Sequence, residues 1–203
     1  MAWDFETEPG FQQKLDWMEG FVREKVEPLG LLGIHPYDVK NPRRNALVRP
    51  LQDEVKRQGL WACHLGPELG GQGYGQVKLG LMNEILGGAS FAPIVFGCQA
   101  PDTGNAEIIA HYGTAEQKQR YLEPLLNGEL FSCYSMTEPH AGADPTMFTT
   151  SAVRDGEDWV IDGWKFFSSN AATSSFLIVM VVTNPNVSAY QGMSVGTRNI
   201  DIP

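Results

Sequence analysis

The sequence has few basic residues in its C-terminal part and no long apolar run. Residues 121–203 hold nine acidic side chains against three basic ones, and the 203-residue chain carries a net charge of −9. Six bases lie between Lys40 and Arg57, a run that is more typical of a solvated helix face than of a phosphate site. We therefore expect no nucleic-acid partner. The longest apolar run, Phe176 to Val182, is far too short to cross a bilayer, so no membrane span is expected.

Cysteine is also scarce, with Cys63, Cys98 and Cys133 far apart in the sequence. An odd number at wide spacing argues against a disulfide framework and against a CxxC zinc site. Buried thiols in a reducing compartment are the favoured interpretation. The first ten residues, MAWDFETEPG, carry acids where a signal peptide carries bases. We expect a soluble, intracellular protein.

Motifs for hydrolytic or metal chemistry are missing. No serine lies in a G-x-S-x-G setting, and the histidines lack metal-ligand spacing. The glycine-rich segment from Pro67 to Gly75 lacks the GK[ST] ending of a phosphate loop, so a turn between helices is favoured. The serines concerned are Ser132, Ser135 and Ser168, and the histidines are His35, His64, His111 and His140.

The pattern of apolar residues changes near Asn127-Gly128. Before it, helical spacing predicts helices over 11–26, 47–59, 79–86 and 103–112, and Thr114 with Gln117 forms a capping-box pair. After it, Asp155-Gly156 and Asp162-Gly163 are hairpin-type turn signals between β-rich runs. The sequence predicts an α+β protein, with a helical domain over 1–128 and an antiparallel, incomplete β domain over 129–203.

The stretch YSMTEPHAGAD, residues 134–144, is a candidate ligand site. Backbone N–H groups beside residues without bulky side chains can approach a pyrophosphate. Thr137 could bond the edge of a polar heterocycle, with Tyr134 and Met136 along its face. The alternative is an ordinary turn in which Glu138 faces solvent.

A second segment, WKFFSSNAA (164–172), could wall a flat ring with aromatic side chains on a strand followed by hydroxyls. The alternative is a sheet core packed with Trp164, Phe166 and Phe167, because strands favour aromatic residues. Taken alone, this segment favours the sheet core.

Together these segments resemble the acyl-CoA dehydrogenase family. The matching stretches are YGTAEQKQRYLEPLLNGELFSCYSMTEPHAGAD (112–144), RDGEDWVIDGWKFFSSNAA (154–172) and PELGGQG, and APDTGN is most like the type 10 and 11 branch. The resemblance implies a helical domain, a middle β domain and a C-terminal helical bundle, with FAD as cofactor. Family members run to about twice this length, so it implies a truncated chain without the bundle.

The resemblance also implies roles for individual residues. Tyr134, Ser135, Met136 and Thr137 would meet the flavin ring, and Gly142 with Ala143 would meet the pyrophosphate. Phe167 stands where the family usually has a tryptophan, and Ser169 stands where a hydroxyl bonds near N5. Ser168 would also contact the cofactor. Ala143 replaces a serine that can also contact substrate, so one hydrogen bond to the phosphate or substrate is lost, on the order of 1 kcal/mol.

The implied reaction is α,β-desaturation of an acyl-CoA, in which a carboxylate removes the α proton and the flavin accepts the β hydride. Neither Glu138 nor Glu84 is favoured as that base, so no catalytic residue is assigned and the base is expected beyond Pro203. The alternatives are a non-catalytic flavin- or acyl-CoA-binding subunit completed by a partner chain, and an acyl-CoA oxidase.

The resemblance implies partners and a location as well. The electron acceptor would be an electron-transfer flavoprotein, and the protein would be a homo-oligomer, either a dimer or a tetramer. It would be cytoplasmic in a bacterium and mitochondrial or peroxisomal in a eukaryote.

Overall fold

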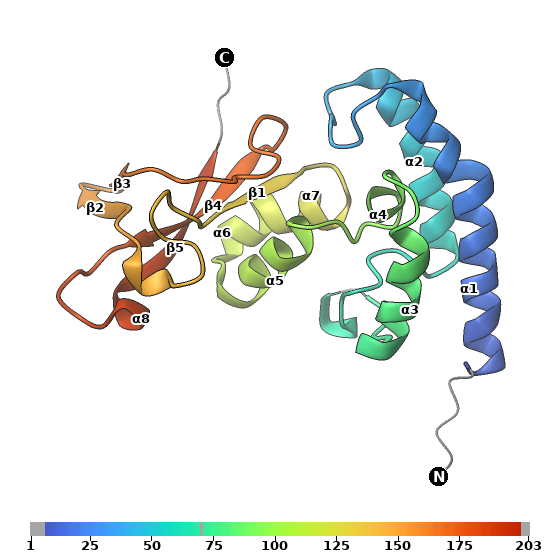
Figure 1. Ribbon diagram of the computed structural model, residues 1–203, viewed down its shortest axis with the longest axis horizontal. Helices are drawn as coiled ribbons and strands as arrows, with labels where there is room; N and C mark the ends of the chain where they lie inside the picture. The colour runs from blue at the N-terminus through green and yellow to red at the C-terminus, as the bar shows by residue number, and fades with distance from the viewer. Residues whose placement is uncertain (1–6, 70, 200–203) are drawn as a thin grey trace, which may run out of the picture. The chain divides into compact units, whose positions relative to one another are not determined.

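The structure is a computed structural model that describes residues 7–69 and 71–199. The chain forms two compact units (Figure 1). The helical unit comprises residues up to Thr103 together with Leu126–Gly128, and the sheet unit comprises Gly104–Leu125 together with the residues from Glu129 onward. The predicted domain boundary between residues 128 and 129 stays a prediction.

The helical unit contains four α-helices and three short turns of other helical types among its described residues. They are α1 (Pro9–Phe21), the π-helical turn η1 (Val22–Val26), the 3-10 turn η2 (Glu27–Leu32), α2 (Pro42–Arg57), the 3-10 turn η3 (Pro67–Leu69), α3 (Gln76–Leu86) and α4 (Ala92–Val95). The first two residues of α5 (Asp102–Tyr112) also belong to this unit.

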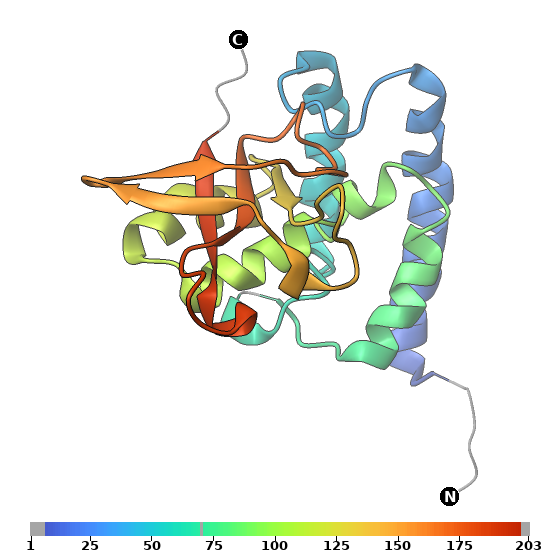
Figure 2. The same ribbon diagram turned by 60° about the vertical axis from the view of Figure 1, so that its left-hand side comes forward.

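The helix predicted from Phe11 to Val26 is confirmed by α1 and η1. Pro9 lies in its first turn, where the missing N–H costs nothing. The apolar residues at spacings of three and four are all buried and form the packed face: Phe11, Leu15, Met18, Val22 and Val26. Figures 1 and 2 show this long helix running beside α3.

Helix α2 begins five residues before the predicted start at Leu47. The Asn41 side chain accepts hydrogen bonds from the backbone N–H of Arg43 and Arg44, at 3.0 and 3.1 Å, and Pro42 occupies the first helical position. An Asn-Pro pair is a strong helix start signal. The prediction was wrong because it relied on the apolar period, which begins later than the cap.

The sheet unit consists of a five-stranded sheet with short helices. Its elements are the rest of α5, α6 (Ala115–Gln117), the π-helical turn η4 (Lys118–Leu122), α7 (Glu123–Leu126, whose last residue belongs to the helical unit), β1 (Ser132–Ser135), the 3-10 turn η5 (Pro145–Met147), β2 (Ser151–Asp155), β3 (Asp158–Asp162), β4 (Phe176–Val182), α8 (Ala189–Gly192) and β5 (Met193–Asn199).

The α+β class and the order of helices before strands are confirmed, but the sheet is mixed rather than purely antiparallel. Strand β4 lies parallel to β1, with Ser132 opposite Phe176, and antiparallel to β5 along its whole length. It meets β2 in parallel only at Ser151 and Val182. Between β1 and β4 the chain forms the β2–β3 hairpin, and β4 then runs in the same direction as β1, so β1 and β4 are not joined as a hairpin.

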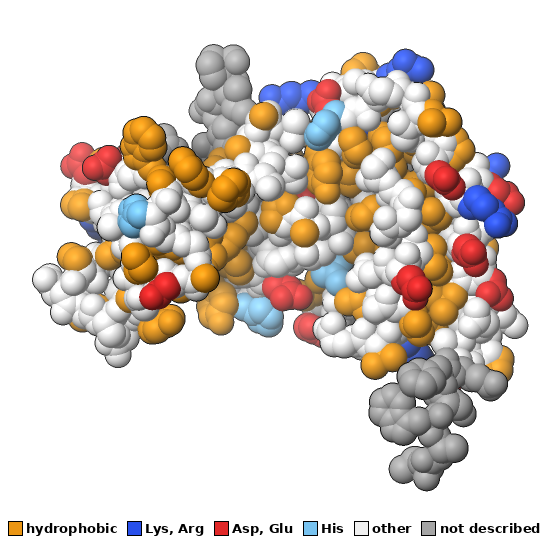
Figure 3. Space-filling model, in the orientation of Figure 1, with side chains coloured by type: hydrophobic (Ala, Val, Ile, Leu, Met, Phe, Trp, Pro, Cys, Tyr) orange, Lys and Arg blue, Asp and Glu red, His pale blue; other side chains and the backbone are white. Residues whose placement is uncertain are grey.

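The β2–β3 hairpin confirms the turn predicted at Asp155-Gly156. Because it is joined to β4 at a single residue, it projects from the sheet (Figures 1 and 2). Val153, Trp159 and Val160 on it are exposed, and apolar and acidic side chains mix on this end in Figure 3. An open pocket of about 840 Å³ lies beside the hairpin, lined in part by Val181 and Val195.

Two predictions about helix starts have different outcomes. Helix α5 begins at Asp102, and the N–H of Thr103 already donates to the Gln99 carbonyl, four residues back, so the predicted cap at Thr103 is wrong. The capping box is confirmed: Thr114 Oγ1 accepts from the Gln117 N–H, and Gln117 Oε1 accepts from the Thr114 N–H at 2.9 Å.

We expect Thr114→Ala to lower the free energy of unfolding by about 1 kcal/mol, because an orphan N–H at the helix start loses its acceptor. Urea unfolding followed by circular dichroism measures the change. Thr114→Ser keeps the hydroxyl and should stay within a few tenths of a kcal/mol of the parent. An equal loss in both variants would contradict a capping role.

Candidate functional site

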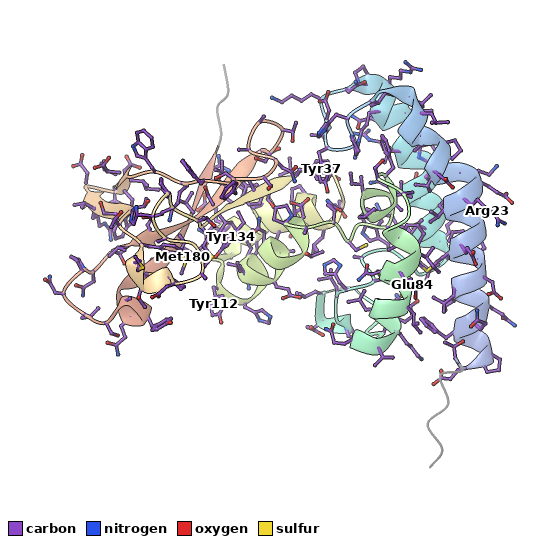
Figure 4. The ribbon with its side chains drawn as sticks, in the orientation of Figure 1. Arg23, Tyr37, Glu84, Tyr112, Tyr134 and Met180 are labelled. Carbon is purple, nitrogen blue, oxygen red and sulfur yellow. The ribbon has the colours of Figure 1, made fainter. Side chains whose placement is uncertain are left out.

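The stretch from Tyr134 to Asp144 begins within β1, where Figure 4 labels Tyr134, and continues past the end of the strand at Ser135. After the strand, Glu138 and Ala141 exchange two backbone hydrogen bonds, at 2.9 and 3.2 Å. Pro139 and His140 therefore form the tip of a tight two-residue turn. Gly142 and Ala143 come directly after it and are exposed.

Glu138 is buried, so the interpretation in which it faces solvent is wrong. Its side chain is 1% exposed, and that of Lys165 is 9% exposed. Oε1 accepts from Lys165 Nζ at 2.9 Å and from the Thr150 N–H at 2.9 Å. Oε2 accepts from the Thr149 N–H at 2.8 Å and from the Thr149 hydroxyl at 3.0 Å. Both oxygens of the carboxylate are thus fully engaged.

This network determines the charge of Glu138. Burial alone would raise the pKa of its carboxyl group, but the hydrogen bonds from Lys165, Thr149 and Thr150 outweigh burial and lower the pKa to about 2. The group is therefore an ionised acceptor at neutral pH. A carboxylate with so low a pKa and no free oxygen is a poor general base.

The same contacts bring the two predicted segments together. Lys165 Nζ also donates to the Met136 carbonyl at 2.8 Å, and the Phe166 N–H donates to the Thr137 carbonyl at 2.8 Å. The Ser135 and Ser168 hydroxyls are 2.6 Å apart and hydrogen-bonded. Residues 135–138 and 165–168 therefore form one connected surface.

The aromatic residues of the second segment lie on the surface. Phe167 is 84% exposed, and Trp164 and Phe166 are exposed as well, so the predicted sheet core is wrong here. The segment is not a strand either: β3 ends at Asp162, and Phe167 has a φ of +56°, which is rare for an aromatic residue. Bonds to the β1 end, rather than local β propensity, set this conformation.

Hydrogen-bond donors near this surface have no acceptor within the described part of the chain. They are the Thr137 hydroxyl and the backbone N–H groups of Gly142 and Ala143. A Cβ added at Gly142 would meet no atom within 4 Å, so the backbone is open to a close approach. Ser169 is exposed, and its hydroxyl makes one long contact of 3.5 Å with the Phe167 carbonyl. Free donors beside an exposed ring fit a phosphorylated, flat cofactor such as FAD.

Comparison with known protein families covers both units. The model of the acyl-CoA dehydrogenase N-terminal domain matches residues 12–129, and that of the middle domain matches residues 133–197. The chain belongs to the acyl-CoA dehydrogenase family. Members of this family are FAD-binding flavoproteins.

Individual relatives agree with the branch that APDTGN indicated. Acyl-CoA dehydrogenase family member 11 of Gallus gallus is 39% identical over 165 residues, covering 79% of this chain and 21% of that protein. Family member 10 of Mus musculus is 32% identical, covering 96% of this chain and 19% of that protein. A solved structure from Mycobacterium abscessus, described as an acyl-CoA dehydrogenase, has a TM-score of 0.82 and 30% identity, covering 98% of this chain and 52% of that one. This chain thus spans a fifth to a half of these relatives.

Within this acyl-CoA dehydrogenase chain, sequence reasoning missed the partners of Glu138. Lys165 lies between two aromatic residues and is the sole base between Arg154 and Arg198, which is a signal for a buried counter-ion. Thr149 and Thr150 contribute mainly backbone N–H groups, which no sequence pattern distinguishes.

Two further features concern residues 7–69 and 71–199, the ranges that the structure describes. No helix in these ranges is long and apolar enough to cross a membrane. Within the same residues, no cluster of three or more His, Cys, Asp or Glu side chains could hold a metal ion.

Proposed function

We propose that the protein acts as an FAD-dependent acyl-CoA dehydrogenase and that this chain supplies the surface facing the flavin. The observation that carries the proposal is that the segment with the exposed Phe167 ring is bonded to Thr137, whose hydroxyl has no partner among the described residues. The buried Glu138–Lys165 pair joins the same two segments. Bound FAD would accept the hydride from the β carbon of the acyl chain, a reaction that side chains cannot perform.

Each proposed binding residue has one task. The Thr137 hydroxyl, with the backbone of Tyr134, Ser135 and Met136, would orient the flavin ring. Phe167 would cover one side of the ring and keep water from it. Ser168 and Ser169 would lie at its edge, although the Ser168 hydroxyl is already bonded to Ser135.

The pyrophosphate would lie against the exposed N–H groups of Gly142 and Ala143. Ala143 provides no hydroxyl for the phosphate or for the substrate. Because Glu138 is ionised and fully hydrogen-bonded, we do not assign it the role of catalytic base.

We expect Gly142→Ala to weaken FAD binding at least tenfold, since the added methyl group would lie where the pyrophosphate approaches. The same methyl group meets no protein atom, so the free energy of unfolding should not change. Ala143→Ser should strengthen binding about fivefold, which corresponds to one added hydrogen bond of about 1 kcal/mol. Titration of the chain with FAD, followed by tryptophan fluorescence, measures both.

An unchanged FAD affinity in Gly142→Ala would contradict the proposed pyrophosphate site at Gly142 and Ala143. The reaction class is tested separately, by adding an acyl-CoA to the flavin-loaded protein without oxygen: the flavin absorption band should bleach. A protein that binds FAD but never bleaches would instead support the second candidate, a non-catalytic subunit completed by a partner chain. The engaged state of Glu138 favours this alternative.

Three further assignments belong to the proposal. An electron-transfer flavoprotein would reoxidise the flavin, and a high yield of hydrogen peroxide under turnover would indicate an acyl-CoA oxidase instead. The substrate would be an acyl-CoA. A homodimer or homotetramer would be the working assembly.

A further inference from the structure

A groove on the sheet unit is bordered by the β2–β3 hairpin and by strand β5, both labelled in Figure 1. It has a volume of about 840 Å³, and we call it the hairpin groove. Its buried lining is apolar, since Ala152 and Val181 belong to one hydrophobic cluster of the sheet. Two strand segments also line it, Asp158–Ile161 on β3 and Ser194–Gly196 on β5. Trp159 is 52% exposed, so apolar surface of the groove is open to solvent.

The two strands that line the groove each have an edge without a neighbour. Among the described strands, β3 pairs only with β2, and β5 pairs only with β4. On such an edge the backbone N–H and C=O groups of every second residue point away from the sheet, where an added extended segment can bond them. Strand β3 has five residues, so a partner segment of about five residues, roughly 17 Å long, would run its whole length.

The charge of the hairpin groove is negative. Of its described lining residues, only Glu157 and Asp158 are charged. Both are exposed, and neither forms an ion pair within the described part of the chain. Arg154, a base on the same hairpin, does not line the groove, and its Nε donates to the Gly156 carbonyl at 3.2 Å. The two carboxylates are therefore available to bases of a partner.

The neutral polar side chains of the groove are already engaged. The Thr183 and Ser194 hydroxyls are hydrogen-bonded to each other at 2.8 Å. The Gln117 side chain belongs to the capping box of α6 and accepts a backbone N–H there. A row of open backbone groups, an apolar lining and two free carboxylates thus remain for recognition. An extended polypeptide with apolar and basic side chains matches all three.

We propose that the hairpin groove is a docking site for an extended segment of a partner protein, in which apolar residues alternate with polar ones and bases flank them. The segment adds to the outer edge of β3 through backbone hydrogen bonds. Its apolar side chains pack against Ile161, Val181 and Val195, and its bases lie beside Glu157 and Asp158. Backbone pairing provides affinity, and the carboxylates select a basic segment over an acidic one.

The test uses the whole chain and three fluorescein-labelled synthetic peptides. The first has lysine at both ends and valine alternating with threonine between them. The second has glutamate at both ends, and the third has the lysine ends but a proline at its centre, which removes a backbone donor. Fluorescence anisotropy measures binding. We expect the lysine peptide to bind about tenfold more tightly than either of the other two.

Hydrogen exchange locates the bound peptide. The lysine peptide should slow amide exchange in β3, Asp158–Asp162, and leave that of α5 unchanged. Equal affinity for the lysine and glutamate peptides, no detectable binding of the lysine peptide, or binding without slower exchange in β3 would overturn the proposal. Analytical ultracentrifugation of the protein alone tests the other occupant: a dimer whose β3 amides are already protected would show that a second copy fills the groove.

Charge reversal provides a matched pair of variants. The double variant Glu157→Lys with Asp158→Lys should weaken binding of the lysine peptide about tenfold and strengthen that of the glutamate peptide. Glu123→Lys replaces an exposed acid of the same unit that does not line the groove, so it should change either affinity by no more than about twofold. Should the double variant fail to fold, the comparison of peptides on the parent chain decides alone. No measurement here uses FAD or an acyl-CoA, so the outcome is independent of the proposed function.

Discussion

Replacing Lys165 with methionine is expected to lower the free energy of unfolding by about 3–5 kcal/mol. Methionine fills much of the lysine volume but leaves the Glu138 carboxylate, which is 1% exposed, without its counter-ion. The charge would remain buried, because the three hydrogen bonds from Thr149 and Thr150 to Glu138 include two backbone N–H groups that stay in place. Urea unfolding of the parent and variant chains at neutral pH measures the difference.

A matched surface pair provides the control. Lys78 lies 3.0 Å from Glu8, the same kind of contact, but these side chains are 35% and 77% exposed. Lys78→Met should therefore cost less than about 1 kcal/mol. The double variant Lys165→Met with Glu138→Gln should recover part of the loss, since no buried charge remains. Equal costs for Lys165→Met and Lys78→Met would refute a special role for the buried pair.

The dependence of stability on acidic pH provides a second test of the Glu138–Lys165 pair. The folded pKa of Glu138, about 2, lies below the ordinary value of 4.5. The stability that it contributes is therefore complete above about pH 4.5 and is lost as the pH falls toward 2. Glu138→Gln should show a smaller decline across this window than the parent does.

Replacing Gly163 with alanine is expected to cost about 3 kcal/mol or more. The new Cβ would lie 2.5 Å from Oγ1 and 2.6 Å from Cα of Thr150, and the φ of +146° is unfavourable for any residue with a side chain. Thr150 is buried and donates its N–H to Glu138, so the clash cannot be relieved without moving the carboxylate network. Thermal or urea unfolding measures the loss.

Gly156 allows the steric clash with Thr150 to be separated from the unfavourable backbone conformation as causes of the loss. It also has a positive φ, +61°, but a Cβ there would meet nothing within 4 Å. Gly156→Ala should therefore cost only the conformational part, about 1–2 kcal/mol. If Gly163→Ala were no worse than Gly156→Ala, close contact with Thr150 could not be the reason for glycine at position 163.

Local patterns were sufficient for much of the fold. The buried face of α1 follows from apolar spacing alone, and the uninterrupted run Phe176–Val182 is strand β4 as predicted. Parallel pairing of β1 with β4 could not be predicted, because it depends on contacts between distant segments. Residues 164–167 have strong β propensity, yet bonds to Thr137 and Met136 hold them outside the sheet.

Family resemblance indicated the stretch around Thr137 and Gly142 as the candidate site, and its binding roles stay a prediction. The structure adds that Thr137 is hydrogen-bonded to Phe166, the neighbour of Phe167 in the sequence. The burial of Glu138 was not readable, because a carboxylate next to a proline in a polar stretch has the local signature of an exposed turn. Its counter-ion lies in a different segment of the chain, so only the three-dimensional contact identifies the pair.

The projecting β2–β3 hairpin affects how copies of this chain meet one another. No described strand pairs with the outer edge of β3, so its backbone N–H and C=O groups could pair with the same strand of a second molecule. The hairpin carries four acids within eight residues, and two of them, Asp158 and Asp162, lie on β3 itself; the other two are Asp155 and Glu157. Two such edges brought together would place like charges opposite each other, so electrostatic repulsion protects this strand from edge-to-edge aggregation.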